Sequence, residues 1–563
     1  MRFIKYCMYI GVSLGILSAC NYLDFDETNG LKTKEHIYAY FNTTEQMLTN
    51  VYSFMPQDLG SIGGAMRDCA CDDAEFGAVG GTIQNMNNGN WSPLLTIDTG
   101  WNLYKGIRAA NNFLVDIESV DLSRYEYDAK YKNWLRKLEI FPYEARILRA
   151  HYFFELARRY GDIPMPLSAL TTDEANSIKK TPFRDVIEFI VKECDECTPH
   201  LPETYANEPD RQTGRVTKGF AMAVKSKALL YAASPLHNPE NDVNLWKRSA
   251  QAALDIINTG LYTLDKASKA NNNKSKEVVL MRMNAENTNF ELNNFPIRFV
   301  NGKRPTTALA NSTFPSQNLV DAFETKNGFS VTLTEEGWKC DDPSFNAQHP
   351  YTNRDPRLAY AVLCNGMQFK GQAIETFVGG ADDISMNQGG SPTGYFLYKY
   401  IQPTTSFVPN NEVKNKHHWI IYRYAETLLT YAESMINAFD DPKYTDDNFI
   451  YSADWAINEV RKNADMPSVK ATGKDDFLKK LYNEWRVEFA FEDHRFWDVR
   501  RWKMGADTQK ELYGVKIINN NGTLQYKRKL VEDREWKDCM YLYPIPQAEI
   551  FKNQNLNPQN QGW

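Results

Sequence analysis

The sequence predicts a mostly α-helical protein whose helices pack against an irregular, loop-rich lobe with short strands. Apolar residues recur at the spacing of amphipathic helices through much of the chain. This periodicity fades between residues 267 and 416, where Asn, Gly, Thr and Pro dominate. Because this stretch is too long to be a simple loop, we expect it to form a lobe of its own.

The N-terminus has the pattern of a lipoprotein export signal. A short basic start is followed by the apolar run Tyr6–Ile16, which is too short to span a bilayer. Small residues then precede a cysteine in LSAC, residues 17–20, as in a lipobox, where the thiol is acylated. We therefore expect residues 1–19 to be a signal peptide, Cys20 to carry the lipid anchor, and residues 20–35 to form a polar tether.

The N-terminal helical region is expected over residues 36–266. Thr44 and Thr217 are candidate N-caps for two of its helices. Pro142 suits the first position of a helix, and Gly260 follows the last apolar position of another. The expected helices span residues 43–55, 101–115, 142–160, 184–197, 215–233 and 246–258.

The C-terminal helical region is expected over residues 417–563, with helices at 422–438 and 453–462. Its most unusual stretch, residues 483–502, interleaves large rings with many charged side chains, NEWRVEFAFEDHRFWDVRRW. Since so many charges beside so many rings cannot all face water, some must be buried, and buried charges persist only when they are paired. We predict an ion-paired structural helix in this stretch rather than a catalytic site.

Composition and motifs argue against several classes of function. The net charge of −7 disfavours a nucleic-acid partner, which requires a basic face. No nucleophile elbow, phosphate loop, zinc-protease helix or dinucleotide fingerprint occurs in the sequence. Besides Cys7 and Cys20, the number of cysteines is odd and their spacings fit no structural zinc site well. We therefore expect neither a disulfide framework nor a bound metal or other cofactor.

Motifs spread along the chain occur together in one known family. A helix reads WNLYKGIRAAN from Trp101, and EARILRAHYFFELARRYGDIP begins at Glu144. RYAETLLTYAE begins at Arg423, and residues 483–502 carry E-x-R-x-E-F-A-F-E followed by R-F-x-D and R-W. With YPIP at Tyr543, these motifs resemble the signature of the SusD/RagB family, the surface nutrient-binding lipoproteins of Bacteroidota.

The resemblance implies a fold, a function and a location. The implied fold is four tetratricopeptide-like helix pairs packed against the irregular lobe, with residues 267–416 on the ligand side. The implied function is capture of an oligo- or polysaccharide and its transfer to a SusC-like TonB-dependent transporter. The implied location is the outer membrane, where the lipid on Cys20 holds the protein facing the cell exterior. Two departures from the motif, Trp485 for a common Arg and Asp493-His494 for a Gly, affect no residue expected to bind ligand.

A small set of residues is expected to contact a sugar. Rigid rings meet the flat C–H faces of sugars, whereas carboxylates and amides meet the rim of hydroxyls. Trp91 is the leading stacking platform because it lies in a Gly- and Asn-rich setting, and loops display residues that helices bury. Trp101, Tyr104, Trp497 and Trp502 are instead expected in the core. The candidate ligand-binding residues are Trp91, Asp73, Asp72, Asn88, Trp338, Tyr351 and Tyr395.

The sequence leaves other functions open. A peptide-binding member of the same family would share the scaffold, and a helical-repeat adaptor would bind only a protein partner. A glycoside hydrolase needs paired carboxylates, for which Asp72, Asp73 and Glu75 are the nearest candidates. Neighbouring residues of an extended chain point in different directions, so we predict that the protein is not an enzyme. Structural calcium in the lobe is also open, and loop shape within residues 60–95 and 267–416 is expected to decide which ligand binds.

Overall fold

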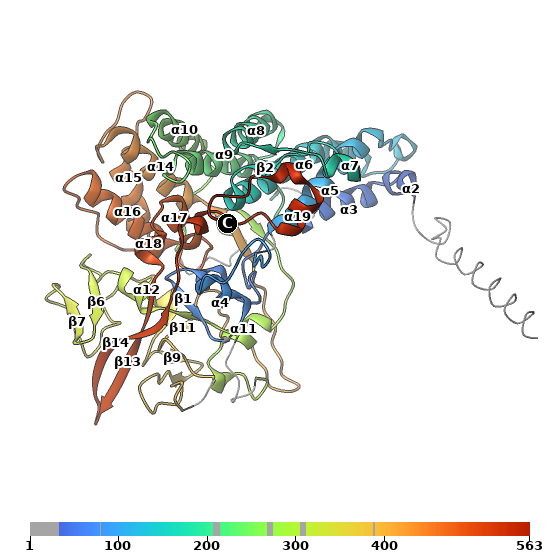
Figure 1. Ribbon diagram of the computed structural model, residues 1–563. Coiled ribbons are helices and arrows are strands. Elements are labelled where there is room, and N and C mark those ends of the chain that lie inside the picture. The colour runs from blue at the N-terminus through green and yellow to red at the C-terminus, as the bar shows by residue number, and fades with distance from the viewer. Residues whose placement is uncertain are drawn as a thin grey trace, which may run out of the picture.

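A layer of helices lies along one side of the molecule and a loop-rich lobe along the other (Figure 1). The computed structural model describes residues 33–78, 80–98, 100–206, 214–266, 274–304, 311–386 and 389–563, so Cys20 and the expected signal peptide lie outside the described residues. The layer contains α3 (Phe41–Ser53), α5 (Leu103–Asp116), α6 (Tyr131–Tyr160), α8 (Phe183–Cys197), α9 (Lys218–Ala233), α10 (Val243–Thr259), α14 (Tyr424–Phe439), α15 (Ala453–Asn463) and α16 (Lys474–Glu488). Helix α5 packs on α6, α8 on α9, α10 on α14 and α14 on α15, which confirms the predicted tetratricopeptide-like arrangement.

The lobe is built from short antiparallel strand pairs and short helices. Its strands are β1 (Ala74–Phe76) with β5 (Thr313–Pro315), β6 (Val331–Thr334) with β7 (Gly337–Cys340), β8 (Val362–Leu363) with β11 (Phe396–Leu397), β9 (Gln368–Phe369) with β10 (Gln372–Ala373), and β13 (Glu511–Asn520) with β14 (Thr523–Asp533). The β13–β14 hairpin comes from the C-terminal region but packs on β6 and β7, and it projects from the lobe (Figure 1). Its turn places Asn521 and Gly522 at φ of 52° and 95°, the left-handed conformation that Asn-Gly hairpin turns favour. The lobe helices are α11 (Asn289–Asn294), α12 (Gln317–Ala322) and α13 (Leu358–Ala361).

Further short elements join these two parts. Strand pairs β2 (Ile163–Pro164) with β3 (Lys180–Thr181) and β4 (Val278–Arg282) with β12 (Trp419–Arg423) complete the sheets. The remaining helices are α2 (Lys34–Tyr38), α4 (Thr82–Asn87), α7 (Thr172–Ala175), α17 (Arg495–Arg501), α18 (Gly505–Thr508) and α19 (Gln547–Lys552). Across the part of the chain that the structure describes, we find no helix with both the length and the apolar character needed to cross a membrane.

Helix α9 begins after Thr217 and helix α10 ends before Gly260, as the sequence predicts. The Thr217 hydroxyl accepts a hydrogen bond from the Phe220 amide at 3.4 Å and so caps the first turn of α9. Gly260 follows α10 with φ of 63°, a left-handed conformation that costs glycine little. The fully buried Ala221 and Ala228 give α9 a small face, which allows its close approach to neighbouring helices.

Two predicted helix starts are wrong. Helix α6 begins at Tyr131, so Pro142 lies inside it rather than at its first position. A proline within a helix removes one backbone hydrogen bond, but Phe141 and Ala145 on either side of it are fully buried, and this packing holds the helix together. Helix α3 begins at Phe41, and the Thr44 hydroxyl donates to the carbonyl oxygen of Tyr40 instead of capping the helix.

The predicted ion-paired helix is interrupted after Glu488. Phe491 and Asp493 both have φ of 61°, so the chain turns between α16 and α17. The turn is held from both sides, because Phe491 is fully buried and the Asp493 carboxylate accepts hydrogen bonds from Arg67 and from the Trp497 indole. Asp493 tolerates this left-handed conformation because its short polar side chain can hydrogen-bond locally.

Candidate functional site

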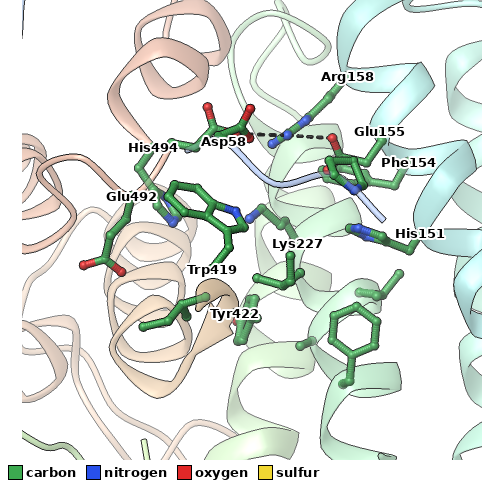
Figure 2. Close-up of a pocket in the computed structure, with 17 residues that line it drawn as sticks. Asp58, His151, Phe154, Glu155, Arg158, Lys227, Trp419, Tyr422, Glu492 and His494 are labelled. Carbon is green, nitrogen blue, oxygen red and sulfur yellow. Dashed lines mark hydrogen bonds and ion pairs between the residues drawn. The ribbon is translucent and has the colours of Figure 1, made fainter. Parts of the chain in front are cut away.

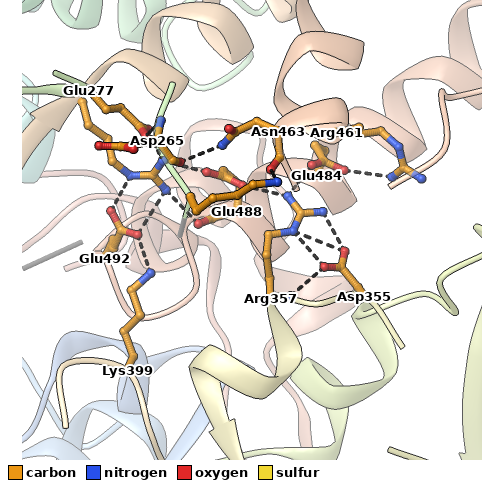
Figure 3. A network of polar contacts seen from close by, with 12 residues as sticks. Asp265, Glu277, Asp355, Arg357, Lys399, Arg461, Asn463, Glu484, Glu488 and Glu492 are labelled. Carbon is orange, nitrogen blue, oxygen red and sulfur yellow. Dashed lines mark hydrogen bonds and ion pairs between the residues drawn. The ribbon is translucent and has the colours of Figure 1, made fainter. Parts of the chain in front are cut away.

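The charges around residues 483–502 form an ion-paired joint between the helical layer and the lobe (Figure 3). The Glu488 carboxylate lies 2.8 Å from Arg357 Nη1 and 2.7 Å from Arg423 Nη1. Arg423 also contacts Glu492 at 2.8 Å and Glu277 at 2.6 Å. All these side chains are buried. The contacts confirm the prediction of an ion-paired structural segment.

Pairing determines the charge state of Glu488. Burial by itself raises the pKa of this carboxyl group, but the guanidinium groups of Arg423 and Arg357 outweigh burial and hold the pKa at about 2. Glu488 is therefore ionised at neutral pH, and its charge is balanced inside the protein. The ion pairs of the joint therefore serve to hold the structure together.

Several titratable side chains line a small cavity beside the joint (Figure 2). Its volume is about 40 Å³, which holds only a few water molecules. Arg158 contacts Glu155 at 2.6 Å and Asp493 at 3.4 Å. Burial raises the pKa of Asp493 to about 7, with Arg67 opposing the rise. Because no sugar fits and these charges face one another, we assign the cavity to the joint and not to an active site.

Asp72 and Asp73, predicted to meet sugar hydroxyls, are buried in contacts with arginines. Arg495 Nε donates to Asp72 at 2.8 Å, and Arg486 Nε donates to Asp73 at 2.7 Å. Cys71 brings a third ligand atom within 4.8 Å of these carboxylates, but the guanidinium groups already balance both charges. The prediction that these acids are open to a sugar is wrong, because residues 483–502 need them as counter-ions.

Trp91 is not an exposed stacking platform in this structure. Its side chain is only 3% exposed, and its ring lies 5.3 Å from Tyr543 and 4.6 Å from Trp563 between centroids. The Gly- and Asn-rich loop around it does reach the surface, since Asn88 is exposed. C-terminal rings therefore cover Trp91, a contact between distant segments that local composition does not reveal.

The structure brings together the three predicted rings of the lobe. The Trp338 and Tyr351 ring centroids are 6.1 Å apart, and those of Tyr351 and Tyr395 are 6.0 Å apart. Tyr395 is fully buried, whereas Trp338 and Tyr351 are half-buried. Trp338 and Tyr351 keep partly open ring surface, so their contact with ligand stays a prediction. Tyr395 instead supports the cluster from within.

The most suitable ligand site is a groove that we name the amide groove. Its walls come from residues 57–66 and 284–294, with Thr313 and His417, and its volume is about 350 Å³. Small-molecule sites in proteins usually occupy roughly 300–1,000 Å³. Six side-chain amides line it, those of Gln57, Asn284, Asn287, Asn289, Asn293 and Asn294. The groove lies where the two loop regions expected to decide ligand identity meet.

Some of these amides hold the groove in shape while others are open. Asn284 donates to the His417 carbonyl at 2.7 Å, and Asn294 accepts from the Thr313 amide at 3.0 Å. The side chains of Asn289 and Asn293 make no hydrogen bond with any residue that the structure describes. Such open amides can donate to and accept from a bound hydroxyl.

An aromatic and imidazole wall faces the same groove. Phe290 and His417 both line it, with ring centroids 5.2 Å apart. His417 Nε2 lies 2.7 Å from the Glu291 carboxylate, while Nδ1 is buried without a partner among the described residues. Phe290 and His417 are only 9% and 2% exposed, so these rings support the groove from behind, and the amides supply its open surface.

The predicted site residues did not include those of the amide groove. The groove joins segments more than two hundred residues apart, and neither segment has a periodic pattern. One local signal was present, because residues 283–294 read MNAENTNFELNN and are unusually rich in Asn. This density of amides in a region expected to face ligand indicates a polar binding surface.

Comparisons with known proteins agree on one family. The SusD family model matches residues 263–563, more than half of the chain. SusD-like protein P2 of Formosa agariphila is 24% identical over 439 residues, which cover 75% of this chain and 73% of that protein. The chain belongs to the SusD family.

Solved structures share the fold across nearly the whole chain. A SusD-like protein from Bacteroides fragilis superposes with a TM-score of 0.74 at 23% identity, covering 94% of this chain and 98% of that one. A second B. fragilis structure, described as a SusD-like carbohydrate-binding protein, gives a TM-score of 0.71 at 23% identity, covering 92% and 100%. The layer of helix pairs and the loop-rich lobe are therefore the SusD-like fold.

Proposed function

We propose that the protein is a cell-surface glycan-binding lipoprotein that captures oligo- or polysaccharide and passes it to a TonB-dependent outer-membrane transporter. The amide groove is the observation that carries this proposal. It is open and lined by side chains that bond hydroxyl groups, and its described lining residues include no pair of carboxylates suited to hydrolysis. One structural relative is itself described as carbohydrate-binding, which supports the same class of ligand.

The proposed location rests on the N-terminal sequence. Cys20 follows small residues and a short apolar run, so we assign it the lipid anchor that holds the protein on the outer membrane facing the exterior. Tethering beside a transporter would keep a captured glycan at high effective concentration near the entrance of that transporter.

We assign transporter docking to a surface of the helical layer. A groove of about 330 Å³ is lined there by the half-buried rings of Trp101 and Tyr104, which were expected in the core. Leu94 and Phe551 are 82% and 70% exposed. The turn that carries Leu94 is hydrogen-bonded to the start of α19, which carries Phe551 and lines the groove. Exposed apolar side chains near a groove are typical of sites of protein contact.

The proposal is tested by titration calorimetry with the protein lacking its lipid anchor, against panels of polysaccharides and peptides. We expect a polysaccharide to bind. Asn289→Ala combined with Asn293→Ala should raise its dissociation constant by about tenfold, since each lost hydrogen bond contributes roughly 0.5–1.5 kcal/mol. The thermal unfolding midpoint should not change, because neither side chain bonds another described residue.

Asn448→Ala, in the exposed loop between α14 and α15, is the matched control and should bind as the wild type does. Glycan binding that survives the double substitution would remove the amide groove from the proposal. Binding of peptides alone would favour a peptide-capturing member of the family, and turnover of a glycan would show an enzyme.

A further inference from the structure

The amide groove has few charges on its walls. Among the described residues that line it, Glu286 is the acidic side chain, and none is lysine or arginine. His417 is the other titratable group on the wall, and its Nε2 faces the Glu291 carboxylate. A ligand in the groove therefore meets amides, one open carboxylate and a second carboxylate behind the wall.

Two cations near the groove are already paired with protein groups. Lys416 lies 3.9 Å from Glu286 in an exposed pair, where it partly offsets that acid. Arg304 is buried behind α11, and its guanidinium donates to the carbonyl oxygens of Leu292 and Phe295 at 2.9 and 2.8 Å. Among the lining residues that the structure describes, none offers a guanidinium for the bidentate contact that carboxylates and sulfates favour.

Amides and hydroxyl groups match each other chemically. An amide side chain offers both donors and an acceptor, and a sugar hydroxyl also donates and accepts. A carboxylate or sulfate only accepts, and it loses its hydration on entering a groove that supplies no opposite charge. Glu286 would repel it as well.

We infer that the amide groove selects neutral, hydroxyl-rich glycans and discriminates against chains that carry uronate or sulfate groups. This inference rests on the proposed glycan-binding function and defines its ligand class. The groove has too little positive charge to bind an anionic chain. It has enough amide groups to hydrogen-bond several hydroxyl groups along a neutral chain.

The test compares neutral and anionic polysaccharides on the purified protein. The neutral probes are a β-glucan, a galactomannan and dextran, and the anionic probes are polygalacturonate, alginate and dextran sulfate. We expect at least one neutral chain to bind, and each anionic chain to bind about tenfold more weakly or not at all in 150 mM salt. A neutral chain that binds should also bind with lower affinity after its C6 hydroxyls are oxidised to carboxylates.

A charge substitution makes the test specific to the groove. Glu286→Lys should lower the ratio of the dissociation constant of the oxidised chain to that of the neutral chain by about tenfold. The substitution replaces a side chain that repels carboxylates with one that attracts them. Glu336→Lys is the matched control, since it makes the same charge change on the distant β6–β7 turn and should leave the difference unchanged.

The outcomes separate the inference from the proposed function. An anionic chain that binds most tightly, and loses binding on Asn289→Ala with Asn293→Ala, would overturn the neutral-ligand inference and leave glycan capture intact. Binding of no polysaccharide at all would overturn both. A Glu286→Lys variant that discriminates as the wild type does would show that the charge of the groove does not select the ligand.

Discussion

The ion-paired joint and the amide groove use polar side chains in opposite ways. In the joint, Arg357, Arg423 and Glu488 are buried and each charge has an opposite charge within 2.8 Å. In the groove, Asn289 and Asn293 are uncharged and open. Full charges hold the two parts of the protein together, and neutral amides are left open in the groove. Since a buried charge without a partner costs far more than an open amide, the protein can leave only the amides unpaired.

The largest expected effect lies in the joint. Glu488→Gln removes the carboxylate that Arg357 and Arg423 share, and it leaves two buried guanidinium groups with less opposing charge. We expect the free energy of unfolding to fall by about 3–5 kcal/mol, as when one partner of a buried pair is lost. Denaturant unfolding measures this loss, and glycan affinity under folding conditions should not change.

The control for this substitution is Glu336→Gln. The Glu336 side chain is 85% exposed and lies 3.7 Å from Lys339, so its loss should change stability by less than about 0.5 kcal/mol. Equal effects of the two substitutions would show that the buried pairs contribute no more than surface pairs, and the contrast between joint and groove would lose its basis.

The next effect in size concerns Trp91. Because its ring packs between Tyr543 and Trp563, Trp91→Ala should leave a cavity and cost about 3 kcal/mol of stability. The glycan dissociation constant, measured by calorimetry on folded protein, should stay within about twofold. Lost glycan affinity with unchanged stability would restore Trp91 as a stacking platform and place the ligand site away from the amide groove.

The smallest effect is a dependence of stability on pH. The pKa of Glu488 is about 2 in the folded protein against an ordinary value of 4.5, so its pairing stabilises the protein above pH 4.5. This contribution is lost as the pH falls from 4.5 towards 2, at about 1 kcal/mol per pH unit. The thermal unfolding midpoint of the wild type should therefore fall more steeply over this range than that of Glu488→Gln. Parallel slopes would contradict the pairing.

Much of the fold could be predicted because its helices have local causes. The Thr217 cap and the glycine after α10 act within a few residues, and the sequence indicates both. The helix start predicted at Pro142 was wrong. A proline inside α6 is tolerated only through packing that local sequence does not show. The pairing of charges in residues 483–502 was predictable from composition, but their partners, such as Arg357, come from other segments.

The site was harder to predict because its properties depend on tertiary contacts. Trp91 looked exposed in its own loop, but it is covered by rings more than four hundred residues away in the chain. Asp72 and Asp73 looked available, but two arginines of the late helices occupy them. Residues of the amide groove carry only the signal of local Asn density, which indicates polarity but does not reveal a concave surface.

The contacts of Arg423 restrict movement between the segments that they join. Its single guanidinium contacts Glu277 before β4, Glu488 at the end of α16 and Glu492 in the turn that follows. Any hinge that opened at this position would have to break all three of these buried contacts together. We therefore expect the segments that carry Glu277, Glu488 and Glu492 to keep their relative positions when a ligand binds or leaves.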